Sequence, residues 1–137
     1  MKPIGKRLGS LIAVFLLLSV LVSPGAAHAD AATDPVIEWN AIMLDTIRSQ
    51  NPFFQARFAA ITQLAVFEAV NAITGDYQPY LGTIAAPSGA SAEAAGVAAA
   101  HGVLMNYFPG SAATLDAART DSLAAIPNGQ AKDEGIA

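Results

Sequence analysis

The chain lacks cysteine altogether, and it contains only two histidines and one tryptophan among its 137 residues. Without cysteine it can form no disulfide and offers no thiolate as a nucleophile, metal ligand or lipid attachment point. It also lacks the Gly-x-Ser-x-Gly elbow, the Walker loop, the dinucleotide fingerprint and the His-Glu-x-x-His motif. No complete catalytic constellation is present, so the sequence assigns no catalytic, cofactor-binding or metal-binding residue.

Residues 1–29 have the three parts of a secretory signal peptide. A basic start that includes Arg7 precedes an apolar run of twelve residues, 11–22, in which Ser19 is the one polar residue, and Ala27-His28-Ala29 forms a small-x-small cleavage site. Twelve helical residues span only about 18 Å, less than the roughly 30 Å of a bilayer core, so a transmembrane helix is the weaker interpretation. We therefore expect a cleaved leader and a secreted or periplasmic mature chain, residues 30–137.

Basic side chains are scarce in that mature chain. Four of them face all eleven acidic residues of the protein, which gives a net charge of −7. Such a balance argues against nucleic acid and against an anionic membrane surface as partners. A chain of about a hundred residues is long enough for one small domain.

Helical spacing of apolar residues and helix-capping signals divide the mature chain into segments. Asp34-Pro35 and Asn51-Pro52 are each an N-cap followed by proline at the first helical position, and Gly75 is a C-terminal stop. The predicted helices are 34–50, 52–73, 91–108, 111–126 and 130–137, the last ending after two turns without completing an apolar face. No segment alternates with period two. The sequence thus predicts an all-α, alanine-rich bundle of four to five helices.

Two polar residues interrupt the apolar side of the second predicted helix. Glu68 shares that side with Phe67, and Asn71 follows three residues later, shortly before the helix stops. A buried carboxylate without partners would cost several kcal/mol, so Glu68 needs hydrogen-bond donors. Asn40 on the first helix and the backbone of the loop after Gly75 are both reasonable candidates. We interpret Glu68 as a structural hydrogen-bonding residue, which is commoner for a lone carboxylate than proton transfer or metal binding.

Other candidates also have structural explanations. Glu38 and Asn40 could bring a carboxylate and an amide together on the first helix. His101, the only histidine of the mature chain, shares a face with Leu104, where a hydrogen-bonded interior or interface histidine is commoner than a ligand or base. The segment Pro87-Ser88-Gly89-Ala90 is similar to a phosphate-binding turn, but it is explained equally by a turn that leads into the Ser91 cap.

Several segments together resemble a known family. They are Trp39-Asn40, residues 65–73 (Ala-Val-Phe-Glu-Ala-Val-Asn-Ala-Ile), Tyr77-Gln78-Pro79-Tyr80, residues 101–109, residues 115–118 and residues 122–127. Their order and spacing are similar to the N-terminal helical region of exported bacterial vanadium-dependent haloperoxidase-like proteins, of the type 2 phosphatidic acid phosphatase superfamily. The resemblance spans nearly all of the mature chain.

The resemblance implies an anion site that binds vanadate or phosphate. Members hold the anion through three later motifs, Lys-x6-Arg-Pro, Pro-Ser-Gly-His and Ser-Arg-x5-His-x3-Asp, whose cations, hydroxyls and histidines neutralise the anion and move protons. None of the three occurs here, and Pro87-Ser88-Gly89-Ala90 lacks the histidine and comes too early. Vanadate would be the cofactor of a full-length haloperoxidase relative, and this chain alone is expected to hold no cofactor.

Two hypotheses follow, from different classes of protein. In the first, the chain is an incomplete N-terminal helical region of a haloperoxidase-like or phosphatase-like protein, inactive alone, whose partner is the missing C-terminal catalytic region or a second copy. In the second, it is a small secreted helical protein with a binding or structural role. The halide or phosphoester used by a full-length relative and the oligomeric state are not determined by the sequence.

Overall fold

The computed structural model describes residues 34–137, and the predicted signal peptide lies outside the described residues. The described part consists of helices α2 (Pro35–Ile47), α3 (Pro52–Thr74), α4 (Ala92–Tyr107), α5 (Ala112–Ala124) and α6 (Gln130–Ile136), with a short 3-10 turn η1 (Pro109–Ser111) before α5. No strand occurs within residues 34–137. The predicted all-α class is therefore confirmed.

The helix boundaries follow from local capping. Side-chain oxygens of Asp34, Asn51 and Ser91 accept hydrogen bonds from the first backbone N–H groups of α2, α3 and α4, at 2.9, 3.2 and 3.1 Å. Gly75 ends α3 in the left-handed conformation, at φ 68°, and its N–H bonds to the carbonyl of Asn71 at 2.8 Å. The predicted boundaries of these helices agree with the structure to within about three residues.

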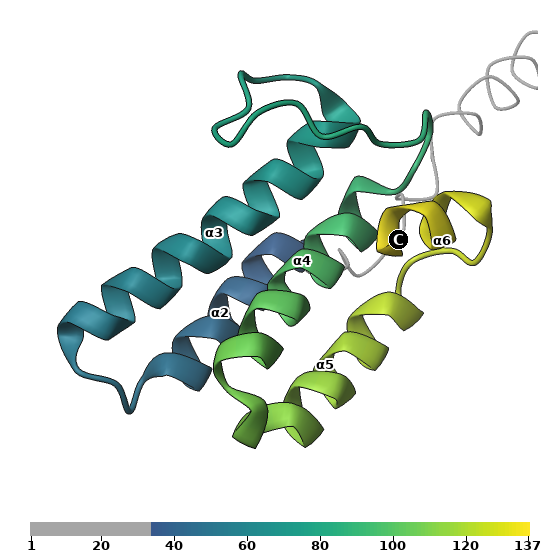
Figure 1. Ribbon diagram of the computed structural model, residues 1–137. Coiled ribbons are helices and arrows are strands. Elements are labelled where there is room, and N and C mark those ends of the chain that lie inside the picture. Colours follow the sequence, from purple (N-terminus) through teal and green to yellow (C-terminus); the bar gives the residue numbers. More distant parts are fainter. Residues whose placement is uncertain (1–33) are drawn as a thin grey trace, which may run out of the picture. The chain divides into compact units, whose positions relative to one another are not determined.

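Helices α2, α3, α4 and α5 alternate in direction, and α4 lies at the centre of the arrangement (Figure 1). Helix α4 contacts α2, α3, α5 and α6. Its alanine and glycine residues allow close approach on several sides at once. The fully buried large side chains are Trp39, Met43, Ile47, Thr62, Val97, Leu104 and Leu115. The core is thus built around α4, and α2 supplies its three largest side chains, Trp39, Met43 and Ile47.

The short last helix differs from expectation. Instead of lacking an apolar face, α6 packs on the start of α4 through Gly135, which is buried, and Ile136. The N–H of Ser91 donates to the carbonyl of Ala131 at 2.7 Å. The contact depends on Gly135, because the absence of a side chain lets the backbones of α6 and of Ser91 approach each other. The spacing of apolar residues in the sequence does not indicate a contact of this kind.

One described helix, α3, is long and apolar enough to span a membrane by length and composition. Core helices of soluble proteins pass the same test, so the test alone does not assign a membrane location to α3.

Candidate functional site

Glu68 lies in the second-last turn of α3 and is almost completely buried, with 4% of the residue exposed. Its Oε1 accepts hydrogen bonds from the backbone N–H groups of Tyr80, at 2.5 Å, and Leu81, at 2.9 Å. Hydrogen bonds to an ionised acceptor are among the strongest in proteins. The carboxylate therefore holds a loop that begins seven residues further along the chain.

Asn71 holds the same loop one turn later on α3. Its Oδ1 accepts from the N–H of Tyr77 at 2.8 Å, and its Nδ2 donates to the carbonyl of Tyr77 at 2.9 Å. One side-chain amide thus satisfies both polar groups of a single peptide residue, as a neighbouring strand would. Together with the cap at Gly75, these bonds fold residues 76–84 back beside the end of α3.

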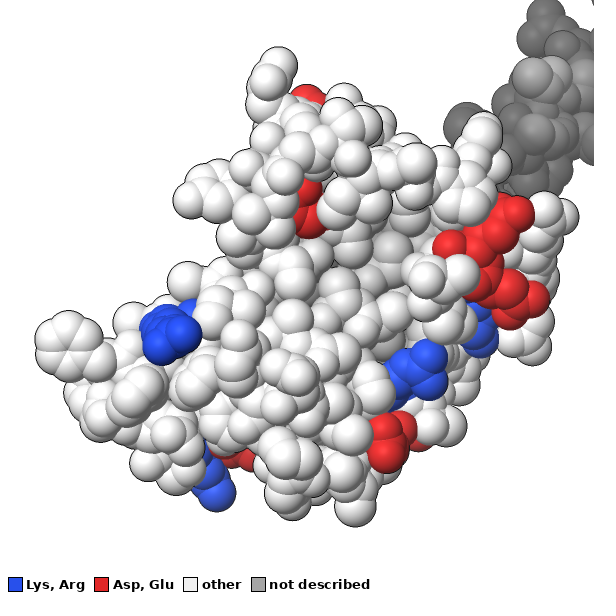
Figure 2. Space-filling view, viewed as in Figure 1, with Lys and Arg blue, Asp and Glu red and all other residues white. Residues whose placement is uncertain are grey.

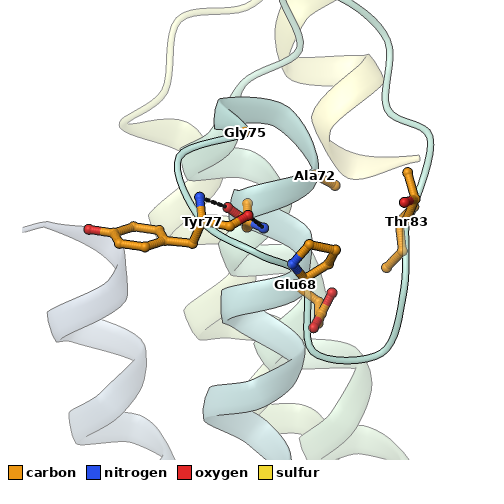
Figure 3. Close-up of a pocket in the computed structure, with 8 residues that line it drawn as sticks. Glu68, Ala72, Gly75, Tyr77 and Thr83 are labelled. Carbon is orange, nitrogen blue, oxygen red and sulfur yellow. Dashed lines mark hydrogen bonds between the residues drawn. The ribbon is translucent and has the colours of Figure 1, made fainter.

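A pocket of about 190 Å³ lies between α3 and this loop. Figure 3 shows the Glu68 carboxylate inside it, between α3 and the returning segment that carries Thr83, while the ring of Tyr77 points away. The residues that line it are Glu68, Asn71, Ala72, Gly75, Tyr77, Pro79, Thr83 and Ile84. The pocket is mostly apolar, and Glu68 is the acidic residue in its lining.

Asn40 does not contribute to this site. It is exposed, and its Oδ1 accepts a hydrogen bond from Nε2 of Gln63 at 3.0 Å, between α2 and α3. Of the two partners considered for Glu68, the loop backbone is the one observed, and the alternative with Asn40 is wrong. Asn40 lies on the side of α2 that faces the middle of α3, too far along α3 from Glu68 to serve.

His101 on α4 contacts one helix on each side of α4. Its Nε2 is 2.8 Å from Oδ1 of Asp116 on α5, and its ring meets the ring of Trp39 on α2 edge to face, with centroids 6.1 Å apart. The histidine side chain is 17% exposed and the Asp116 side chain 61% exposed. The arrangement links α2, α4 and α5.

A second buried polar group was missed by the sequence interpretation. Oγ of Ser122 on α5 lies 3.1 Å from both Nε1 of Trp39 and Oε2 of Glu38, which are adjacent residues on α2. Ser122 also lies 2.9 Å from the carbonyl of Ala118. The indole N–H of a buried tryptophan needs an acceptor, which was the one available signal, but the 83 positions that separate the pair gave no indication of which residue supplies it.

The remaining candidate, Pro87-Ser88-Gly89-Ala90, forms a turn in which the N–H of Ala90 donates to the carbonyl of Pro87 at 3.2 Å. It leads directly into the Ser91 cap of α4. Within residues 34–137, no group of three or more histidine or acidic side chains converges in a geometry that could hold a metal ion.

Comparison of the chain with protein-family models, with curated proteins and with solved structures gives no match.

Proposed function

We propose that residues 34–137 form a helical, non-catalytic packing region of a haloperoxidase-like protein. The resemblance supplies the family, and one structural observation supports the packing role: large apolar side chains are exposed at both ends of α3. They are Phe53 and Phe54 at its start and Tyr77, Tyr80, Leu81 and Ile84 on the loop after its end. We refer to these six residues as the α3 apolar groups.

The exposure of these side chains is large. Phe53 is 90% exposed, Tyr80 75% and Leu81 70%. Figure 2 shows few charged side chains on the face that includes α3. Exposed apolar groups of this size, on a segment whose polar side chains are already used to fix the loop, favour contact with another protein surface. In the proposed role, that surface belongs to the helices that carry the three anion-site motifs.

In that role the chain itself performs no reaction. The oxidation of halide with vanadate, or the hydrolysis of a phosphomonoester, belongs to the region with the three motifs. The reading frame beyond the codon for Ala137 tests the family assignment. We expect it to encode Lys-x6-Arg-Pro, Pro-Ser-Gly-His and Ser-Arg-x5-His-x3-Asp in that order, and a genuine stop codon there would contradict the proposal.

The packing role has its own test on residues 30–137 alone. Exposed apolar groups without a partner should cause self-association in sedimentation velocity and binding of a hydrophobic dye. The double replacement Tyr80→Ser with Leu81→Ser should reduce both. A matched control is Ile37→Ser, because Ile37 is 65% exposed on a different helix. Equal behaviour of the double variant and the control would contradict a role for the α3 apolar groups.

A second candidate function is a small secreted helical binding protein that folds independently. The observation that favours it is the completeness of the described fold, in which every buried side-chain nitrogen and oxygen has a hydrogen-bond partner and α6 closes one end of α4. This candidate predicts a monomer that melts in one cooperative transition, measured by circular dichroism together with sedimentation. A broad transition accompanied by association would contradict it.

A further inference from the structure

Glu68 lacks a counter-charge in the described fold. Residues 34–137 contain four basic side chains. Arg48 pairs with Asp45 on the surface at 3.4 Å, and Lys132 donates to carbonyls at the end of α5. Arg57 and Arg119 form no ion pair with a carboxylate of this part of the chain. Buried charges in proteins are normally paired, so a carboxylate that is 4% exposed and supported by two amides alone is unusual.

The two oxygens of the Glu68 carboxylate are used unequally. Oε1 accepts both hydrogen bonds, from Tyr80 and Leu81, and Oε2 has no donor among residues 34–137. The carboxylate lines the 190 Å³ pocket, opposite the segment that carries Thr83 (Figure 3). Ala72, Pro79 and Ile84 give the pocket apolar walls. Since every buried side-chain oxygen of residues 34–137 has a partner, Oε2 without a donor must open into the pocket, where it faces an apolar lining.

We propose that this pocket binds the ammonium group of an alkylamine, either a free amine or a lysine side chain. An ammonium ion is compact and can donate a charge-assisted hydrogen bond to the single oxygen Oε2, while its alkyl chain lies against the apolar wall. Tyr77 and Ile84 belong both to this lining and to the α3 apolar groups, so the two proposals share part of one surface. They are separated by their readouts, which are amine binding here and self-association for the packing role.

The same geometry disfavours two other cations. A guanidinium binds carboxylates best through two parallel bonds, one to each oxygen, and Oε1 of Glu68 already accepts two backbone N–H groups. A calcium ion takes six to eight oxygen ligands, most often with several carboxylates. Glu68 is the one carboxylate in the lining of this pocket.

The backbone amides of Tyr80 and Leu81 provide a direct readout, because they donate to the carboxylate that the amine would bind. We would titrate the 15N-labelled protein, purified after export, with n-butylammonium chloride at low ionic strength, where electrostatic attraction is least screened. We expect saturable shifts of these two amide signals with a dissociation constant on the order of millimolar. A second titration uses a lysine blocked at both ends. Tighter binding of the blocked lysine favours a lysine side chain as the ligand, and tighter binding of n-butylammonium favours a free amine.

Matched variants separate the charge from the fold. Glu68→Gln keeps an oxygen that can accept from Tyr80 and Leu81 but removes the charge, and it should weaken butylammonium binding at least tenfold. The Tyr77 amide signal, which reports the bonds to Asn71, should stay at its wild-type position if the loop is intact. Glu38→Gln removes a carboxylate elsewhere and should leave binding unchanged. n-Butanol, which has the same chain without the charge, should cause no saturable shift.

Three results would overturn the proposal. They are the absence of saturation with both amines, equal binding by the Glu68→Gln variant with its loop intact, and equal shifts with n-butanol. Should Glu68→Gln lose its loop structure, the wild-type comparison of n-butylammonium with n-butanol still decides the matter.

Discussion

The side chain of Asn71 forms the same pair of backbone hydrogen bonds that a residue of a neighbouring strand would form. It satisfies both the N–H and the carbonyl of Tyr77, and it is only 7% exposed. At the scale of the residue, such double use makes substitution costly, because removal of one side chain leaves two backbone groups to find other partners. Glu68 also serves two backbone groups, since its Oε1 accepts from the N–H groups of Tyr80 and Leu81.

Replacement of Asn71 by alanine should lower the free energy of unfolding by about 1–3 kcal/mol, because polar groups of Tyr77 lose their partners. Urea denaturation measures this change, and hydrogen exchange at the Tyr77 amide should become faster. Asn106→Ala is the matched control, since Asn106 is exposed on α4. A difference between the two variants of less than about 0.5 kcal/mol would show that the amide of Asn71 does not anchor the loop.

Ser122→Ala should be destabilising by about 1–3 kcal/mol, because it leaves Nε1 of the buried Trp39 without its acceptor. Trp39 is the only tryptophan of the protein, so its fluorescence spectrum reports the change directly. Ser49→Ala, at an exposed position between α2 and α3, serves as the control. An unchanged spectrum together with unchanged stability would contradict the hydrogen bond between Trp39 and Ser122.

At the scale of the element, α6 shows how a short helix is held by backbone contact. A methyl group built on Gly135 would come within 2.3 Å of the carbonyl oxygen of Ser91 and 3.1 Å of the side chain of Ala94. Lys132 holds the other side of α6, where its Nζ donates to the carbonyls of Leu123 and Ile126. Seven residues would not form a stable helix alone, so tertiary contacts maintain α6.

Gly135→Ala should therefore lower stability by about 1–3 kcal/mol, since α6 must move away from α4 to admit the methyl group. Gly102→Ala on α4 is the opposite case, because a methyl group there meets nothing within 4 Å. It should raise stability by about 0.5–1 kcal/mol through higher helix propensity. Thermal melting of both variants tests the pair, and a neutral Gly135→Ala would contradict the tight contact of α6 with Ser91.

At the scale of the whole molecule, stability depends on α4 as the shared partner of the other helices. Leu104 on α4 is 0% exposed and belongs to the same core cluster as side chains from α2, α3 and α5. If residues 34–137 unfold as one unit, damage at this position should be felt at the Trp39 side chain and in the helix signal together.

Leu104→Ala should lower the free energy of unfolding by about 2–5 kcal/mol, because it removes buried methyl groups and leaves a cavity. Leu44→Ala, at a position that is 52% exposed, should have only a small effect. Denaturation followed by tryptophan fluorescence and by circular dichroism should give coincident transitions for both variants. Separate transitions would indicate that the helices do not form one cooperative unit.

The amino-acid sequence alone determined where α2, α3 and α4 begin and where α3 ends, because the caps Asp34, Asn51 and Ser91 and the stop at Gly75 act through neighbouring backbone groups. It also determined that Glu68 needs partners, since a buried charge is costly in any fold. Tertiary structure alone decided which groups those are: the loop rather than Asn40, Ser122 for Trp39, and Ser91 for Gly135. The reason is that these contacts depend on how helices distant in the sequence pack together, and a glycine or a lone serine leaves no periodic pattern from which its partner can be predicted.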